Sequence, residues 1–105
     1  MIRKWVEAFN SGNAANVTSL YRADSMLLPT LDKSLLLSRP LIHAYLENLI
    51  ERQGAVVCLH DYTRRGNTEA GFYTFELGNG DKIAARFTMT VKGGKIAAHH
   101  SSIIP

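Results

Sequence analysis

Two adjacent histidines near the end of the chain are the side chains best placed by type to do chemistry. Histidine titrates near neutral pH, so His99 or His100 could act as a general base or as a donor that orients a ligand. Neighbouring residues of a strand point to opposite faces, so only one of the two lines a given cavity unless a bulge intervenes. The alternative is that one packs at a subunit interface and the other hydrogen-bonds to Ser101, Ser102 or a backbone group.

Arg86 is the second candidate, because it stands between apolar Ala85 and Phe87, where an unpaired charge is costly. A guanidinium binds a carboxylate or phosphate through two hydrogen bonds, so Arg86 is a candidate anion anchor inside the domain. Two other interpretations remain open. Arg86 could face outward at an oligomer interface, or it could pair with Glu69 or Glu76 on the neighbouring strand.

Several aromatic side chains could line a pocket for a small molecule, and the alternative is that they simply form the core. They are Trp5, Tyr21, Tyr45, Phe72 and Tyr73. The predicted ligand-binding set combines three of them with the polar candidates. It comprises Trp5, Tyr45, Tyr73, Arg86, His99 and His100.

Motifs for metals, cofactors and nucleophiles are missing from the sequence. Zinc needs three or four converging ligands, and the remaining histidines, His43 and His60, fall on different predicted elements without a shared spacing. There is no nucleophile elbow and no phosphate loop, and Gly78-Asn79-Gly80 is typical of a hairpin turn. No carboxylate is clearly aimed at a cavity. We therefore expect no metal and no cofactor, and we assign no catalytic residue.

Composition narrows the class of protein. A chain of 105 residues, 46% hydrophobic and 20% charged, predicts one globular domain over residues 1–105. The net charge of +3 is scattered, which argues against nucleic-acid binding. No apolar run spans a bilayer, and the first residues do not resemble a signal peptide. With the lone Cys58, these features predict a cytoplasmic protein that binds no membrane.

Hydrophobic periodicity predicts helices first and strands afterwards. An apolar stripe at Ile2, Trp5, Val6 and Phe9 indicates an amphipathic helix, and a short second helix carries Val17, Leu20 and Tyr21 on one face. A third helix begins at the cap Ser38 and ends at Gly54. The expected strands cover residues 25–28, 55–63, 68–77, 82–91 and 96–104, with a possible short strand at 35–37. This order predicts an α+β domain with helices on one face of a curved sheet.

Particular residues resemble a known family, the nuclear transport factor 2-like proteins, and within it the calcium/calmodulin-dependent kinase II association domain and its stand-alone bacterial relatives. The similarity runs through nearly the whole chain in order. The matching segments are 5–13 (WVEAFNSGN), Leu20-Tyr21, 27–30 (LLPT), 44–49 (AYLENL), 71–75 (GFYTF), 85–88 (ARFT) and 99–105 (HHSSIIP). The glycine-rich hairpin 92–95 and the loop 31–33 depart from the family pattern.

The resemblance implies a cystatin-like cone, in which a curved, mostly antiparallel sheet wraps around about three helices and leaves a cavity at its open end. It also implies a homodimer or larger ring, and Tyr45 is where family members present a tyrosine to the cavity. The expected function is binding of a small molecule, with an anion as one option, or assembly. The alternatives are a small isomerase, dehydratase or cyclase that uses a pocket histidine and Arg86, and a module that binds a macromolecule through its sheet face.

Overall fold

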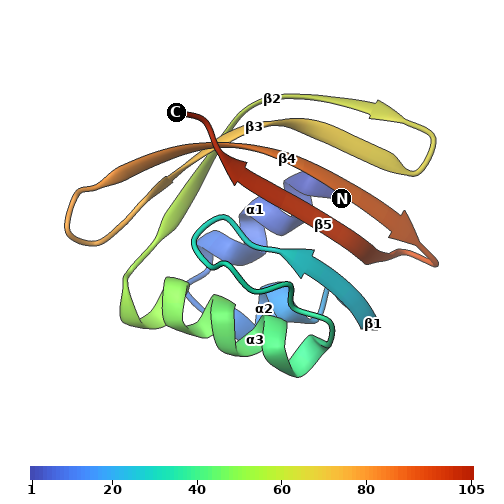
Figure 1. The fold of residues 1–105 in the computed structure, drawn as a ribbon, viewed down its shortest axis with the longest axis horizontal. Coiled ribbons are helices and arrows are strands. Elements are labelled where there is room, and N and C mark those ends of the chain that lie inside the picture. The colour runs from blue at the N-terminus through green and yellow to red at the C-terminus, as the bar shows by residue number, and fades with distance from the viewer.

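A five-stranded sheet arches over the helices in the computed structural model, which describes residues 1–105 (Figure 1). No helix is long and apolar enough to cross a membrane. In chain order the elements are α1 (Ile2–Asn10), α2 (Ala14–Thr18), β1 (Tyr21–Leu28), α3 (Arg39–Glu47), a π-helical turn (Asn48–Arg52), β2 (Val56–Arg65), β3 (Thr68–Glu76), β4 (Lys82–Lys92) and β5 (Lys95–Ile103).

The strands lie in the order β1-β5-β4-β3-β2. Strand β1 runs parallel to β5, and every other neighbouring pair is antiparallel. All the helices lie on one side of the sheet, and its opposite, convex face carries no covering layer (Figure 1). The predicted α+β class, with a mixed curved sheet over helices, is confirmed.

The helices form where the apolar stripes and capping residues predict them. In α1 the residues Ile2, Trp5 and Phe9 are buried against the sheet. The side chain of Asn13 caps α2 by accepting a hydrogen bond from the Ala15 amide, and Ser38 caps α3 in the same way. These helices supply the floor beneath the concave face of the sheet.

Strand β1 is longer than its sequence suggests. It begins at Tyr21, which the apolar periodicity assigned to the second helix, whereas α2 already ends at Thr18. Pairing with β5 overrides the local pattern, since the amide of Ile96 donates to the carbonyl of Leu20 at 2.8 Å. The expected strand at 35–37 is only a single bridge, between Leu36 and Leu27.

Two local features bend the sheet and close its turns. Strand β2 bulges between Leu59 and Asp61, and there Gly71 of β3 is so close that a Cβ atom would collide with the Asp61 carbonyl. In the β4–β5 hairpin, Gly93 and Gly94 have φ angles of +59° and +76°, which a two-residue hairpin turn requires and side-chain-bearing residues adopt with strain.

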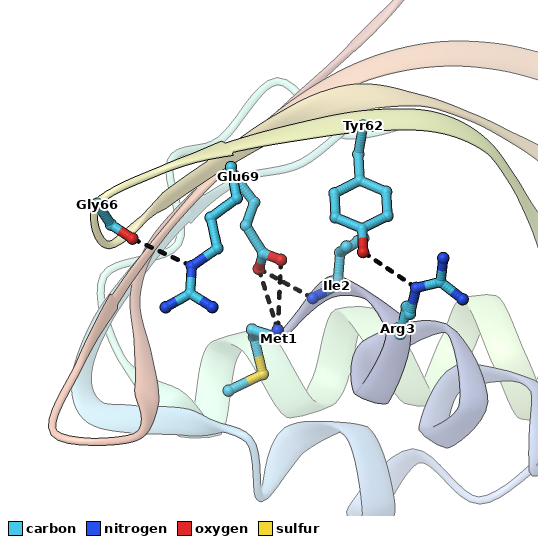
Figure 2. Close-up of polar contacts among 7 residues, drawn as sticks. Met1, Ile2, Arg3, Tyr62, Gly66 and Glu69 are labelled. Carbon is cyan, nitrogen blue, oxygen red and sulfur yellow. Dashed lines mark hydrogen bonds and ion pairs between the residues drawn. The ribbon is translucent and has the colours of Figure 1, made fainter.

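Both ends of α1 are tied to the sheet, which fixes the position of Trp5. At the start, the buried carboxylate of Glu69 accepts hydrogen bonds from the amide of Ile2 and from the amino group of Met1 (Figure 2). The next residue, Arg3, donates to the phenol of Tyr62 (Figure 2). At the end, the Asn10 side chain donates to the carbonyl of Val57 and accepts from its amide, both at 2.8 Å. The Asn10 amide thus occupies the free edge of β2 as a neighbouring strand would.

Replacing Asn10 with alanine should lower the free energy of unfolding by about 1 kcal/mol, because two backbone groups of an edge strand lose their partner and turn to water. Urea denaturation measures the change. The matched control is Asn16→Ala, whose side chain is exposed and bonds only to an exposed serine, and which should change stability by less than about 0.5 kcal/mol. Equal losses in the two variants would contradict this role for Asn10.

Candidate functional site

His99 lies at the centre of the only extended side-chain network inside the domain. It is 4% exposed and points from β5 toward the helices. Its Nδ1 atom lies 2.7 Å from the hydroxyl of Tyr21, and its Nε2 atom lies 3.1 Å from the hydroxyl of Tyr73. Both ring nitrogens are therefore engaged by phenols, one from β1 and one from β3.

The network continues in both directions from this histidine. On one side the indole N–H of Trp5 donates to the Tyr21 oxygen at 3.0 Å. On the other side Tyr73 donates to the hydroxyl of Ser101 at 2.7 Å, and Ser101 in turn contacts the hydroxyl of Thr30. Trp5 also stacks against Tyr73, with ring centroids 5.7 Å apart. Six side chains thus form one connected, mostly buried chain.

A small cavity adjoins this chain. Its free volume is about 10 Å³, which is the space one water molecule requires. Tyr45 of α3 stands beside Thr30 in its lining, and its hydroxyl accepts a hydrogen bond from the Leu31 amide at 3.3 Å. The apolar part of the wall consists of Trp5, Phe9, Leu27, Leu46, Leu49 and Phe75.

The interior favours uncharged groups. Burial lowers the pKa of His99 to about 3, and the nearby His100 lowers it further in the same direction. Burial also raises the pKa of Tyr45 to about 12 and the pKa values of Tyr21 and Tyr73 well above their ordinary range. No lysine, arginine or carboxylate lines the cavity. At neutral pH the site is therefore a set of neutral hydrogen-bonding groups within hydrocarbon.

Such an arrangement can hold and orient a neutral polar group, but it is poorly suited to proton abstraction. A general base works best with a pKa near the operating pH, and His99 lies several units below it with both nitrogens occupied. No three side chains among histidine, cysteine, aspartate and glutamate converge as a metal site would need.

Four of the six predicted site residues come together here, namely Trp5, Tyr45, Tyr73 and His99. Arg86 does not project into the interior, contrary to its expected place as an anion anchor. Its neighbours Ala85 and Phe87 fill the concave side, so strand alternation turns Arg86 outward, where it is exposed. Arg86 also forms no ion pair with Glu69 or Glu76. The carboxylate of Glu69 is instead bonded to the start of α1.

His100 also lies outside the cavity, because it follows His99 on a strand and points to the convex face. The structure thus decides which of the two histidines faces inward. Three network members were not in the predicted set, namely Tyr21, Ser101 and Thr30. The alternation of β5 places Ser101 on the same face as His99, so its position was accessible from the sequence. Thr30 lies in an irregular segment after Pro29, where no periodicity indicates direction.

The arched sheet with the helices on its concave side is the architecture of the nuclear transport factor 2-like class of domains. Residues 2–99 match the model of the SnoaL-like domain family. The chain belongs to this family, and the predicted resemblance is confirmed.

Solved structures agree with this assignment. A protein described as a calcium/calmodulin-dependent protein kinase II association domain, from Xanthomonas campestris, is 32% identical with a TM-score of 0.82, and the match covers 99% of this chain and 83% of that one. The epoxide hydrolase/cyclase-like enzyme SalBIII, involved in pyran ring formation in salinomycin, has a TM-score of 0.86 at 15% identity, covering 98% and 87%. A protein described as a polyketide cyclase from Sinorhizobium meliloti has a TM-score of 0.83 at 12% identity, covering 95% and 91%.

The last two likenesses show the fold alone. No curated protein is significantly similar to the chain.

The lowered pKa of His99 should make folding depend on pH. Its folded pKa lies below its ordinary value of 6.5, so the stability that depends on the neutral ring is complete above about pH 6.5 and is lost as the pH falls toward about 3. Between pH 6 and 4 the folding equilibrium constant of the wild type, relative to a His99→Gln variant, should fall by about tenfold per pH unit. Urea denaturation at several pH values measures it.

Carboxylates titrate in both proteins, so their effect cancels in this ratio. His60→Gln, at an exposed position, is the control for replacing a histidine as such. A ratio of wild type to His99→Gln that does not change with pH would show that the ring is already charged, or solvated, in the folded state.

Proposed function

We propose that this domain is an assembly module that binds a second copy of itself through the convex face of its sheet. The observation that carries the proposal is that this face has no covering layer and yet exposes large apolar side chains. Phe72 is 49% exposed, Met26 is 47% exposed and Leu28 is 40% exposed. An antiparallel sheet face that meets only water usually carries polar residues at such positions.

Strand register places these residues in rows across the sheet. One row crosses Phe72, Arg86 and Ser102, and the next crosses Thr88, His100 and Leu28. Met26, Leu28, Thr88 and His100 also border a hollow of about 240 Å³ on this face. The middle of the face is therefore mainly apolar and hydroxyl-bearing, with the guanidinium of Arg86 on one side of Phe72 and the exposed Asp61 on the other.

A second copy of the chain suits this surface better than a charged macromolecule. The cores of protein interfaces are depleted in charged residues and enriched in aromatic residues, methionine and arginine. A two-fold contact places the same patch on both partners, so a face with few charges avoids like-charge repulsion. The Xanthomonas campestris relative described as an association domain supports the same proposal.

Substituting Phe72 with lysine should convert the oligomer into a monomer, because the contact would lose its exposed aromatic side chain and would have to bury an ammonium group in its place. Light scattering at micromolar concentration measures the mass. The matched control is Leu41→Lys, which charges an equally exposed leucine on α3. A wild type that is already monomeric, or an oligomer that survives Phe72→Lys but not Leu41→Lys, would overturn the assembly proposal.

Binding of a small uncharged molecule in the interior is a second candidate function. The observation that favours it is the polar cluster around His99, which lies at the wall of an otherwise apolar cavity. This corrects the expectation of an anionic ligand held by Arg86, because a buried carboxylate without a cation is costly. The ligand sites of globular proteins commonly combine such apolar walls with a few convergent polar groups.

Entry of a ligand requires the cavity to enlarge. The hydrogen bond from the Leu31 amide to Tyr45 and the contact between Thr30 and Ser101 hold the 29–31 segment against α3 and β5. Both contacts are between neutral groups, each worth on the order of 1 kcal/mol. The segment can therefore open without unfolding the sheet.

An isomerase, dehydratase or cyclase role fits the geometry less well. Arg86 and His99 lie on opposite faces of the sheet, so they cannot act on one substrate. No carboxylate lines the cavity to take a proton in place of the histidine, and the buried Glu69 is bonded to the start of α1 instead.

Titration with cyclohexanone and with cyclohexanecarboxylate at pH 7 tests the second candidate. Trp5 is the only tryptophan and lines the cavity, so its indole N–H resonance reports occupancy. Cyclohexanone should shift this resonance saturably, and the carboxylate should bind at least about tenfold more weakly. The absence of a saturable shift with either probe, or equal affinities for both, would refute an uncharged interior ligand.

A further inference from the structure

The interior hydrogen bonds have a direction that can be worked out, because each hydroxyl carries one hydrogen. Tyr73 donates its hydrogen to Ser101 at 2.7 Å. Its contact with His99 Nε2, at 3.1 Å, must therefore be one in which the ring nitrogen donates and the phenol oxygen accepts. His99 thus carries a hydrogen on Nε2.

The other ring nitrogen is then fixed as well. Burial keeps the imidazole neutral, so Nδ1 bears no hydrogen and accepts from the hydroxyl of Tyr21 at 2.7 Å. The indole of Trp5 is a donor only, and it donates to the same Tyr21 oxygen at 3.0 Å. From Trp5 through Tyr21 and His99 to Tyr73, each group therefore donates to the next one, and each donor hydrogen has an acceptor.

The direction of the hydrogen bond between Ser101 and Thr30 follows by elimination. Ser101 is buried, it accepts from Tyr73, and its remaining hydrogen has Thr30 as its one recorded partner. A buried hydroxyl hydrogen without an acceptor costs about 1–3 kcal/mol, so Ser101 donates to Thr30. The hydrogen of the half-buried Thr30 hydroxyl then has only the phenol oxygen of Tyr73 nearby, and that oxygen already accepts from His99.

The hydroxyl hydrogen of Tyr45 is likewise free to donate. Its oxygen accepts from the Leu31 amide, and its own hydrogen has no recorded partner. Thr30 and Tyr45 both belong to the cavity lining, at the segment that closes it. Two donors thus stand where a ligand would enter, and no cation or carboxylate accompanies them.

We propose that the interior is a one-way chain of donors, running from Trp5 through Tyr21, His99, Tyr73 and Ser101 to Thr30, and that it selects uncharged ligands bearing a hydrogen-bond acceptor such as a carbonyl or ether oxygen. The second part rests on the interior site proposed above. Neighbouring bonds in such a chain polarise one another in the same sense, which strengthens the final Thr30 donor. Thr30 is thereby the residue that determines specificity.

The direction of the chain is tested on the ligand-free protein. Long-range ¹H–¹⁵N NMR of the imidazoles distinguishes a nitrogen with hydrogen from one without. The His99 signals are assigned from variants of the other three histidines, His43→Gln, His60→Gln and His100→Gln. At pH 7 His99 should show hydrogen on Nε2 and none on Nδ1. The opposite tautomer, or an imidazolium, would overturn the proposed direction whatever the ligand.

The ligand class is tested with two probes of the same shape, cyclohexanone and methylenecyclohexane, which differ in the acceptor oxygen. The wild type should prefer the ketone by about five- to tenfold, the worth of one neutral hydrogen bond. In Thr30→Val this preference should vanish while the affinity for the hydrocarbon stays unchanged. Thr30→Ser keeps the hydroxyl and should keep the preference.

The outcomes separate this inference from the interior site on which it rests. If neither probe shifts the Trp5 resonance, the interior binding proposal falls and the ligand class falls with it, while the tautomer result still decides the direction of the chain. If both probes bind equally to the wild type, the site exists and the acceptor specificity is overturned. A ketone preference that survives in Thr30→Val would show that Thr30 does not determine the specificity.

Discussion

The constraint on which the interior depends is that a buried imidazole must have both of its nitrogens satisfied. In a folded core an unpaired polar atom costs more than a hydrogen bond gains, so His99 requires a partner on each side. Tyr21 and Tyr73 provide them from strands on either side of β5, although the two residues lie far apart in sequence. The order β1-β5-β4-β3 makes this geometry available, and the curvature of the sheet brings the phenols inward.

The two faces of the sheet consequently separate two kinds of chemistry. The concave face carries neutral hydrogen-bonding groups surrounded by hydrocarbon, and the convex face carries Arg86, His100 and exposed apolar side chains. Strand alternation alone produces this division, since His99 and His100 are neighbours. This division underlies both proposals, a neutral group held at the inner face and a second copy bound at the outer face.

Much of the fold was predictable from the sequence, because caps, apolar stripes and alternation are local. The start of β1 at Tyr21 was not, since pairing with β5 is a long-range effect. Alternation also showed that Arg86 and Phe87 face opposite ways, but which face is concave depends on where the helices pack. Thr30 could not be placed at all, since an irregular segment has no period.

The most direct test of this account is an NMR titration of the His99 ring in the intact domain. The account predicts that both ring nitrogens keep their neutral chemical shifts from pH 8 down to about pH 4, because burial holds the pKa near 3. An imidazolium already formed at pH 6 would contradict it, since the phenols could then no longer be arranged as a one-way chain.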